Sequence, residues 1–131
     1  MAETNENSVI TKARRIKTCK ASSGALDSLP PVAYMAFGDG GCDDEGEPIQ
    51  PTEDQTALKH EIARYPVGDA TYPVETTARY SVTVPKTELV GQTINEAALV
   101  DSDGDAVAIK TMYPKRKDAG AAFTFTLDDE F

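Results

Sequence analysis

The feature that most constrains this sequence is a β-hairpin signal within residues 92–111. Two apolar runs, at residues 97–100 and 106–109, flank the dipeptide Asp103-Gly104. Aspartate followed by glycine accommodates the two positive φ angles of a type I′ turn better than most pairs. We therefore expect two antiparallel strands joined at this dipeptide.

The register of this hairpin decides which side chains share a face. With Asp103 and Gly104 as the loop, the predicted pairs are Ser102 with Asp105, Val100 with Val107, Ala98 with Ile109 and Glu96 with Thr111. One face then carries Ala98, Val100, Val107 and Ile109, and the other carries Ala97, Leu99, Ala106 and Ala108. Because both faces are apolar, neither should be left to water over its full length. The hairpin should be central, covered by other elements or by a neighbouring subunit.

The length and charge of the chain bound its organisation and its partners. At 131 residues it suits one domain, spanning residues 1–131, with polar residues 1–7 expected to be disordered. A net charge of −9 disfavours nucleic-acid and membrane partners. No apolar run approaches the roughly 18 residues of a membrane span, and the N-terminus lacks an export signal. We expect a soluble, non-exported protein.

Two motifs resemble ligand-binding sites but lack the residues or the spacing that such sites require. The run from Asp101 to Asp105 resembles a calcium loop, but its glycine is fourth rather than sixth and the twelfth residue is Met112. The glycine-rich run 38–41 follows a predicted strand, but acids follow it instead of Lys-Ser/Thr, so its field would repel phosphate. The sequence predicts no cofactor, no metal site and no catalytic residue.

The two cysteines, Cys19 and Cys42, lack the close spacing of a zinc site. Two reduced thiols are the favoured interpretation. A disulfide between them remains open, although it would be unusual without an export signal.

Hydrophobic spacing predicts a mainly β (α+β) fold, an antiparallel sandwich-like domain with two helices. Apolar residues at helical spacing favour a first helix over residues 8–20, capped by Ser8. A capping-box pattern from Thr52 to Gln55 favours a second helix over 53–65, ended by Pro66. Short apolar or alternating segments predict strands at 32–37, 71–75, 77–84 and 123–127.

Charge is distributed unevenly along the chain, and the first helix is its basic end. Residues 8–20 carry +5 with no acid, so the remaining residues carry −14. A helical projection places Ala13 and Ile16 on the inner side, with Arg14 and Arg15 projecting outward. The helix is therefore a candidate docking element for an acidic partner, and its candidate residues are Lys12, Arg14, Arg15 and Lys17. The favoured interpretation of the same charges is internal, with the acidic loop 39–54 receiving the helix.

Four stretches, in this order, resemble the tail-collar fibre family of contractile-tailed bacteriophages and prophages. They are the N-terminal helix with Ile10-Thr11, the run MAFGDGG at residues 35–41, the run QTALKHE at 55–61 leading to Arg64, and the run INEAALVD at 94–101 followed by Asp103-Gly104 and Ala108-Ile109. The resemblance covers nearly the whole chain.

The resemblance implies a non-enzymatic structural role. Members attach a tail fibre or companion protein to the baseplate, so the expected partners are other tail or baseplate proteins. The expected location is the virion tail, after synthesis and assembly in the bacterial cytoplasm. Fibres of this family are trimeric, which implies a homo-oligomer, with a trimer favoured. The alternative function is a carbohydrate-binding module for host-surface adhesion, which would use Tyr34, Tyr65, Tyr72, Tyr80 and Tyr113 as stacking faces.

Overall fold

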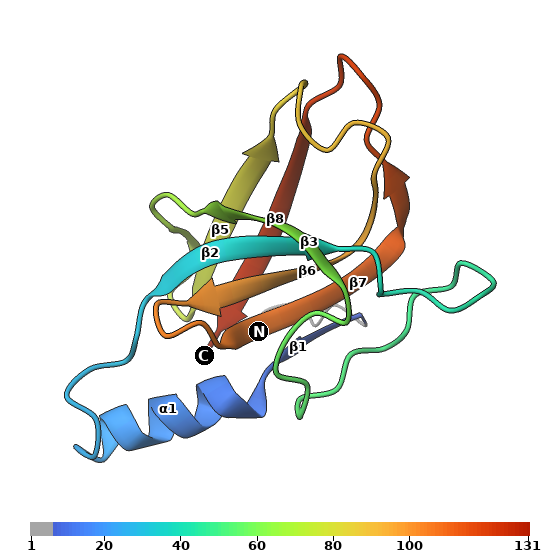
Figure 1. Cartoon of the computed structure of the whole chain (residues 1–131). Coiled ribbons are helices and arrows are strands. Elements are labelled where there is room, and N and C mark those ends of the chain that lie inside the picture. The colour runs from blue at the N-terminus through green and yellow to red at the C-terminus, as the bar shows by residue number, and fades with distance from the viewer. Residues whose placement is uncertain (1–6) are drawn as a thin grey trace.

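The alternating segments assemble into antiparallel sheets in the computed structural model, which describes residues 7–131 (Figure 1). In chain order the elements are β1 (Ser8–Ile10), α1 (Lys12–Ser22), β2 (Val32–Gly38), β3 (Glu61–Pro66), β4 (Thr71–Val74), β5 (Thr77–Val84), β6 (Thr93–Asp101), β7 (Ala106–Arg116) and β8 (Phe123–Glu130). Five strands form one sheet in the order β1-β7-β6-β2-β3, and three form the other in the order β4-β5-β8. The predicted mainly β, sandwich-like fold class is confirmed.

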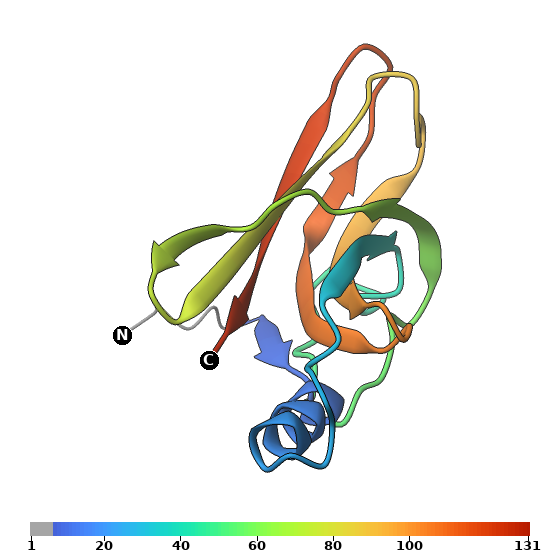
Figure 2. The ribbon, with the colours of Figure 1, turned by 90° about the vertical axis from the view of Figure 1, so that its left-hand side faces the viewer.

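The main core lies between the two sheets. Figure 2 shows β5 and β8 standing beside β6 and β7, with α1 beneath the larger sheet. Phe37 on β2 contacts Phe125 on β8, with ring centroids 4.8 Å apart. Val84, Leu99 and Val107 are fully buried in the same cluster. The core therefore joins all of the long strands in one hydrophobic unit.

The opposite face of the larger sheet is lined by small side chains and covered by the chain itself. Ala36 and Ala98 are buried there, with Leu58 and Val9 packed against them. The covering segment includes Ile49 and is bonded directly to the sheet. The hydroxyl of Thr111 on β7 donates to the carbonyl of Ile49 at 2.8 Å. The central hairpin is thus covered on both faces, and its apolar character no longer argues for a neighbouring subunit.

The hairpin turn differs from the predicted type I′ turn. Gly104 has a φ of 95°, but Asp103 does not have a positive φ. The N–H of Gly104 donates to the carbonyl of Asp101 at 2.9 Å, and the N–H of Asp101 donates to the carbonyl of Asp105 at 2.9 Å. The loop therefore has three residues with one left-handed glycine, a common alternative for hairpins.

The longer loop changes part of the predicted register. Ala98 pairs with Ile109 as expected, but Val100 pairs with Ala106, which leaves Val107 as the extra residue of a bulge. The bulge exchanges the faces of two neighbours: Val107 joins the main core and Ala106 joins the alanine-lined face. The larger of the two side chains thus lies in the main core.

The first predicted helix exists with shifted bounds. Ser8 lies in strand β1 rather than capping the helix, and Thr11 is the N-cap, accepting a hydrogen bond from the N–H of Arg14 at 3.1 Å. Residues 8–10 pair with β7, which accounts for the later helix start. The one helix among residues 7–131 is neither long nor apolar enough to cross a membrane.

The second predicted helix, over residues 53–65, is wrong. The Thr52–Gln55 pattern forms only a turn, in which the N–H of Gln55 donates to the carbonyl of Thr52 at 3.1 Å. The chain then runs irregularly to β3, which pairs with β2. Hydrogen bonds from Lys59 and His60 to the distant carboxylate of Glu96 hold the end of the intervening segment in place.

The other predicted strands are confirmed within a few residues. They correspond to β2, β4, β5 and β8. The expectation of disorder falls mainly on residues 1–6, which lie outside the described residues. The carbonyl of Asn7 accepts a hydrogen bond from the N–H of Thr111 at 2.9 Å.

Candidate docking site

Helix α1 is seated on the sheets by a buried ion pair. Arg14 is the only buried residue of the helix and is 5% exposed. One of its guanidinium nitrogens lies 3.1 Å from a carboxylate oxygen of Asp129 on β8, and the other donates to the carbonyl of Pro30 at 2.5 Å. The prediction that Arg14 projects outward is therefore wrong, because the buried carboxylate of Asp129 draws the guanidinium inward.

The hydrogen-bonding groups of this ion pair are only partly satisfied. Burial raises the pKa of Asp129, and the charge and hydrogen bond of Arg14 oppose that shift. Within the described chain, Nε of Arg14 and Oδ1 of Asp129 are buried without a hydrogen-bond partner. The pair therefore positions the helix, while its net contribution to stability is reduced by incomplete hydrogen bonding.

Lys17 fixes the helix to the tip of the central hairpin. Its ammonium lies 2.7 Å from the carboxylates of Asp101 and Asp105, and 3.2 Å from that of Asp103. Burial alone would lower the pKa of Lys17, but hydrogen bonds to the three aspartates outweigh burial and raise it. The alternating aspartates thus surround a cation supplied by the chain itself.

The remaining basic side chains of α1 face solvent. Arg15 pairs with Glu53 at 3.0 Å, but both side chains are more than half exposed, so the pair is weak. Lys12 and Lys20 are exposed and make no ion pair within the described chain. Ile16, predicted to be buried, is 45% exposed. We define the outer face of α1 as Lys12, Arg15, Ile16, Cys19 and Lys20, all exposed.

This arrangement divides the four predicted docking residues into two pairs. Lys12 and Arg15 lie on the outer face, whereas Arg14 and Lys17 hold the helix in place. The predicted docking residues did not include Ile16 or Lys20, which are both exposed. Their spacing of four and eight residues from Lys12 was the available signal, since such positions share one side of a helix.

A second polar cluster lies at the end of β2, around the carboxylate of Glu96. This carboxylate is fully buried and accepts hydrogen bonds from the backbone N–H groups of Gly40 at 2.8 Å, His60 at 2.9 Å and Lys59 at 3.0 Å. The neighbouring side chain of Asn95 accepts from the N–H of Gly41 at 2.8 Å. We call this cluster the Glu96 junction.

The glycines of the junction are required by close approach. A Cβ at Gly38 would lie 2.3 Å from the carbonyl oxygen of His60, and one at Gly41 would lie 2.4 Å from that of Asn95. Such contacts are far below van der Waals distance, so side chains are excluded there. The glycine-rich run therefore wraps a carboxylate of the same chain.

The junction brings together three of the stretches that carry the family resemblance, at residues 35–41, 55–61 and 94–101. A family model for the phage tail-collar fibre protein, N-terminal, matches residues 3–125. The chain belongs to this family. Tail-collar fibre proteins are structural proteins of the phage tail, so this chain is a tail component. No curated protein and no solved structure matches it significantly.

The tyrosines of this tail-collar protein are mostly engaged within the fold. The hydroxyl of Tyr65 donates to Glu88 at 2.9 Å, and burial raises the pKa of Tyr65 to about 12. The ring of Tyr34 lies under the guanidinium of Arg64, 5.6 Å from its centroid. Tyr80 packs partly buried against the core, while Tyr72 and Tyr113 are largely exposed. The two cysteines, Cys19 and Cys42, are free thiols.

Proposed function

We propose that this protein attaches a tail fibre or a companion protein to the phage baseplate, and that the outer face of α1 makes the contact with the neighbouring tail subunit. The observation that carries the proposal is the opposite use of the two sides of the helix. Arg14 and Lys17 hold the inner side on the sheets, while Lys12, Arg15 and Ile16 are left exposed. A fixed helix with an exposed basic and apolar face is suited to docking, because its backbone is already ordered before binding.

The charge of this face indicates the chemistry of its partner. The outer face carries three basic side chains around Ile16, on a chain whose net charge is −9. An acidic surface with an apolar contact would complement it and would be steered toward it. We further propose that the protein works as a homo-oligomer, with a trimer favoured, and is assembled into tails in the bacterial cytoplasm.

A complementation experiment tests attachment. Particles made without this protein should lack fibres in electron micrographs, and wild-type protein should restore them. Lys12→Glu with Arg15→Glu should fold normally but fail to restore fibres, because it reverses the proposed docking charge. Lys86→Glu with Arg116→Glu makes the same change in charge at other exposed positions and should restore them. Full restoration by the first variant would contradict the proposed face.

A glycan array separates attachment from carbohydrate recognition. A pure attachment module should bind no glycan at micromolar protein concentration. Binding that is lost on replacing the exposed Tyr72 or Tyr113 by alanine would instead support the carbohydrate function.

A further inference from the structure

We propose that the outer face of α1 binds a second copy of this chain, through an acidic loop at residues 42–48 that we call the acidic arm. The inference rests on the proposed function and names the partner of the same face. It follows from the shape of the helix face, the prior ordering of the arm, and the positions of the two on one molecule.

The helix face has two cations with an apolar centre. Lys12, Ile16 and Lys20 follow one another at intervals of four residues, so they line one side of the helix. The two ammonium-bearing residues are eight positions apart, or about 12 Å along the axis. Neither lysine has an ion pair within residues 7–131, so both charges are available to a partner.

The acidic arm is ordered before it meets any partner. A β-bridge between Cys42 and Pro48 closes it. Within it, the carboxylate of Asp43 accepts hydrogen bonds from the N–H groups of Glu45 at 2.9 Å and Glu47 at 3.0 Å. The hydroxyl of Tyr113 donates to Glu47 at 3.0 Å and ties the arm to β7. Because its shape is already fixed, the arm loses little conformational entropy on binding.

The exposed acids of the arm complement the helix face in charge. Asp44, Glu45 and Glu47 are all exposed, and the first two make no ion pair within the described chain. A chain with a net charge of −9 repels its own copies except where a basic surface meets an acidic one. The outer face of α1 supplies such a basic surface, and every copy carries one arm for each face.

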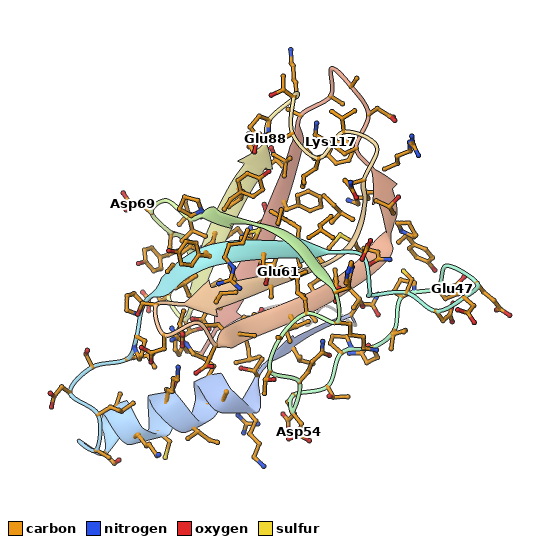
Figure 3. All side chains as sticks on the ribbon, in the orientation of Figure 1. Glu47, Asp54, Glu61, Asp69, Glu88 and Lys117 are labelled. Atoms are coloured by element: carbon orange, nitrogen blue, oxygen red, sulfur yellow. The ribbon has the colours of Figure 1, made fainter. Side chains whose placement is uncertain are left out.

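Within one copy the two surfaces point away from each other. Figure 1 shows α1 and the arm projecting on opposite sides of the sheets, and Figure 3 shows Glu47 near the tip of the arm. The contact must therefore join different copies. Because two different patches meet, the interface is heterologous, and a closing rotation would give a ring such as a trimer.

Charge reversal on each surface tests the pairing. The helix variant is Lys12→Glu with Lys20→Glu, and the arm variant is Asp44→Lys with Glu45→Lys. By light scattering coupled to size exclusion, wild-type protein should associate at high concentration, and each variant alone should run as a single chain. The chain that carries all four changes should associate like the wild type, because its complementarity is restored with reversed sign.

An equimolar mixture of the two variants gives a sharper test. Contacts should form only between unlike variants. In each variant the helix face and the arm carry charge of the same sign, so two copies of one variant repel each other. The mixture should therefore associate, but only in even-numbered closed rings, so a three-membered ring should be absent. Added salt should weaken each assembly, because exposed charges are screened.

Controls separate loss of contact from loss of fold. All variants should keep the melting temperature of the wild type within a few degrees, because the four positions are exposed. Lys86→Glu with Arg116→Glu is the matched change in charge and should associate normally. A wild-type chain that stays monomeric, or assembly that survives both reversals, overturns the inference. If the monomeric chain still loses particle attachment on Lys12→Glu with Arg15→Glu, the proposed function stands with another acidic tail protein as the partner.

Discussion

Arg14 and Asp129 form a buried ion pair at 3.1 Å, between residues 115 positions apart in the chain. The contact joins the helix that carries the proposed docking face to β8 in the smaller sheet. It makes the orientation of α1 depend on a residue near the end of the described chain.

Replacing Arg14 with methionine should reduce the free energy of unfolding by about 3 to 5 kcal/mol, because it leaves the Asp129 carboxylate buried and unpaired. Arg14→Met combined with Asp129→Leu should cost much less, since it removes both desolvated charges. Urea denaturation measures both losses. The adjacent Arg15→Met is the control and should cost no more than about 1 kcal/mol, because its ion pair is exposed. Equal losses for Arg14→Met and Arg15→Met would contradict a seating role for Arg14.

Glu96→Gln should reduce the free energy of unfolding by about 1 to 3 kcal/mol, because one backbone N–H group loses its hydrogen-bond acceptor. The glutamine carbonyl can still accept from Gly40 and His60, which share one carboxylate oxygen in the wild type, but its amide group then faces the N–H of Lys59. Hydrogen exchange followed by NMR should show faster exchange at Lys59 than at the other two amides. Glu45→Gln, at an exposed position, should change stability by less than about 0.5 kcal/mol. Equal acceleration at all three amides would count against this geometry.

Phe125→Ala should cost about 3 to 5 kcal/mol, because Phe125 is 5% exposed and packs on Phe37 between the sheets. Thermal unfolding measures the loss. Phe131→Ala removes the same side chain at a position that is 61% exposed, and it should leave the melting temperature nearly unchanged. An unchanged melting temperature for Phe125→Ala would show that β8 does not contribute to the core.

His60 should titrate above its ordinary pKa of 6.5, because a hydrogen bond to Asp39 and the charge of that carboxylate favour the imidazolium. It is the only histidine of the chain, so proton NMR reports its titration directly. Asp39→Asn should move the pKa back toward 6.5. A wild-type value at or below 6.5 would rule out the hydrogen bond in solution.

The same pair predicts the sign of a pH dependence. Because the folded pKa of His60 is raised, its stabilising contribution is fully present below the unfolded value of 6.5 and is lost as the pH rises through the folded pKa. Denaturation midpoints of wild type and His60→Gln, compared between about pH 5 and pH 8, should therefore converge as the pH rises. Divergence with rising pH would mean that the sign is wrong.

Strands were predictable wherever local alternation decided the structure. In β5, Val82 and Val84 point inward while Ser81 and Thr83 stay exposed, and this period of two is visible in the sequence alone. The second helix was not predictable, because its local signals were overruled from a distance. Glu96 accepts hydrogen bonds from the backbone amides of Lys59 and His60, which lie 37 and 36 residues away in the chain. No capping pattern in the sequence indicates that contact.

The helix proposed for docking was predictable in location but not in orientation. The cluster of basic residues identified α1, but a helical projection assumes that apolar residues face inward. Here the seat is polar, so Arg14 is buried and Ile16 is exposed. The assumption fails because Arg14 pairs with Asp129 on β8. The position of Asp129 is fixed by the fold of the whole chain.

The Glu96 junction has a consequence for how sequences of this family can diverge. The Gly40 amide binds the carboxylate of Glu96 and the Gly41 amide binds the side chain of Asn95, although 56 and 54 residues separate the partners. A Cβ at Gly38 would lie 2.5 Å from a carboxylate oxygen of Glu96, and a Cβ at Gly40 would lie 3.0 Å from it, so a side chain at either glycine would displace the carboxylate. Across tail-collar relatives, the acid and the glycines should therefore be inherited together or lost together.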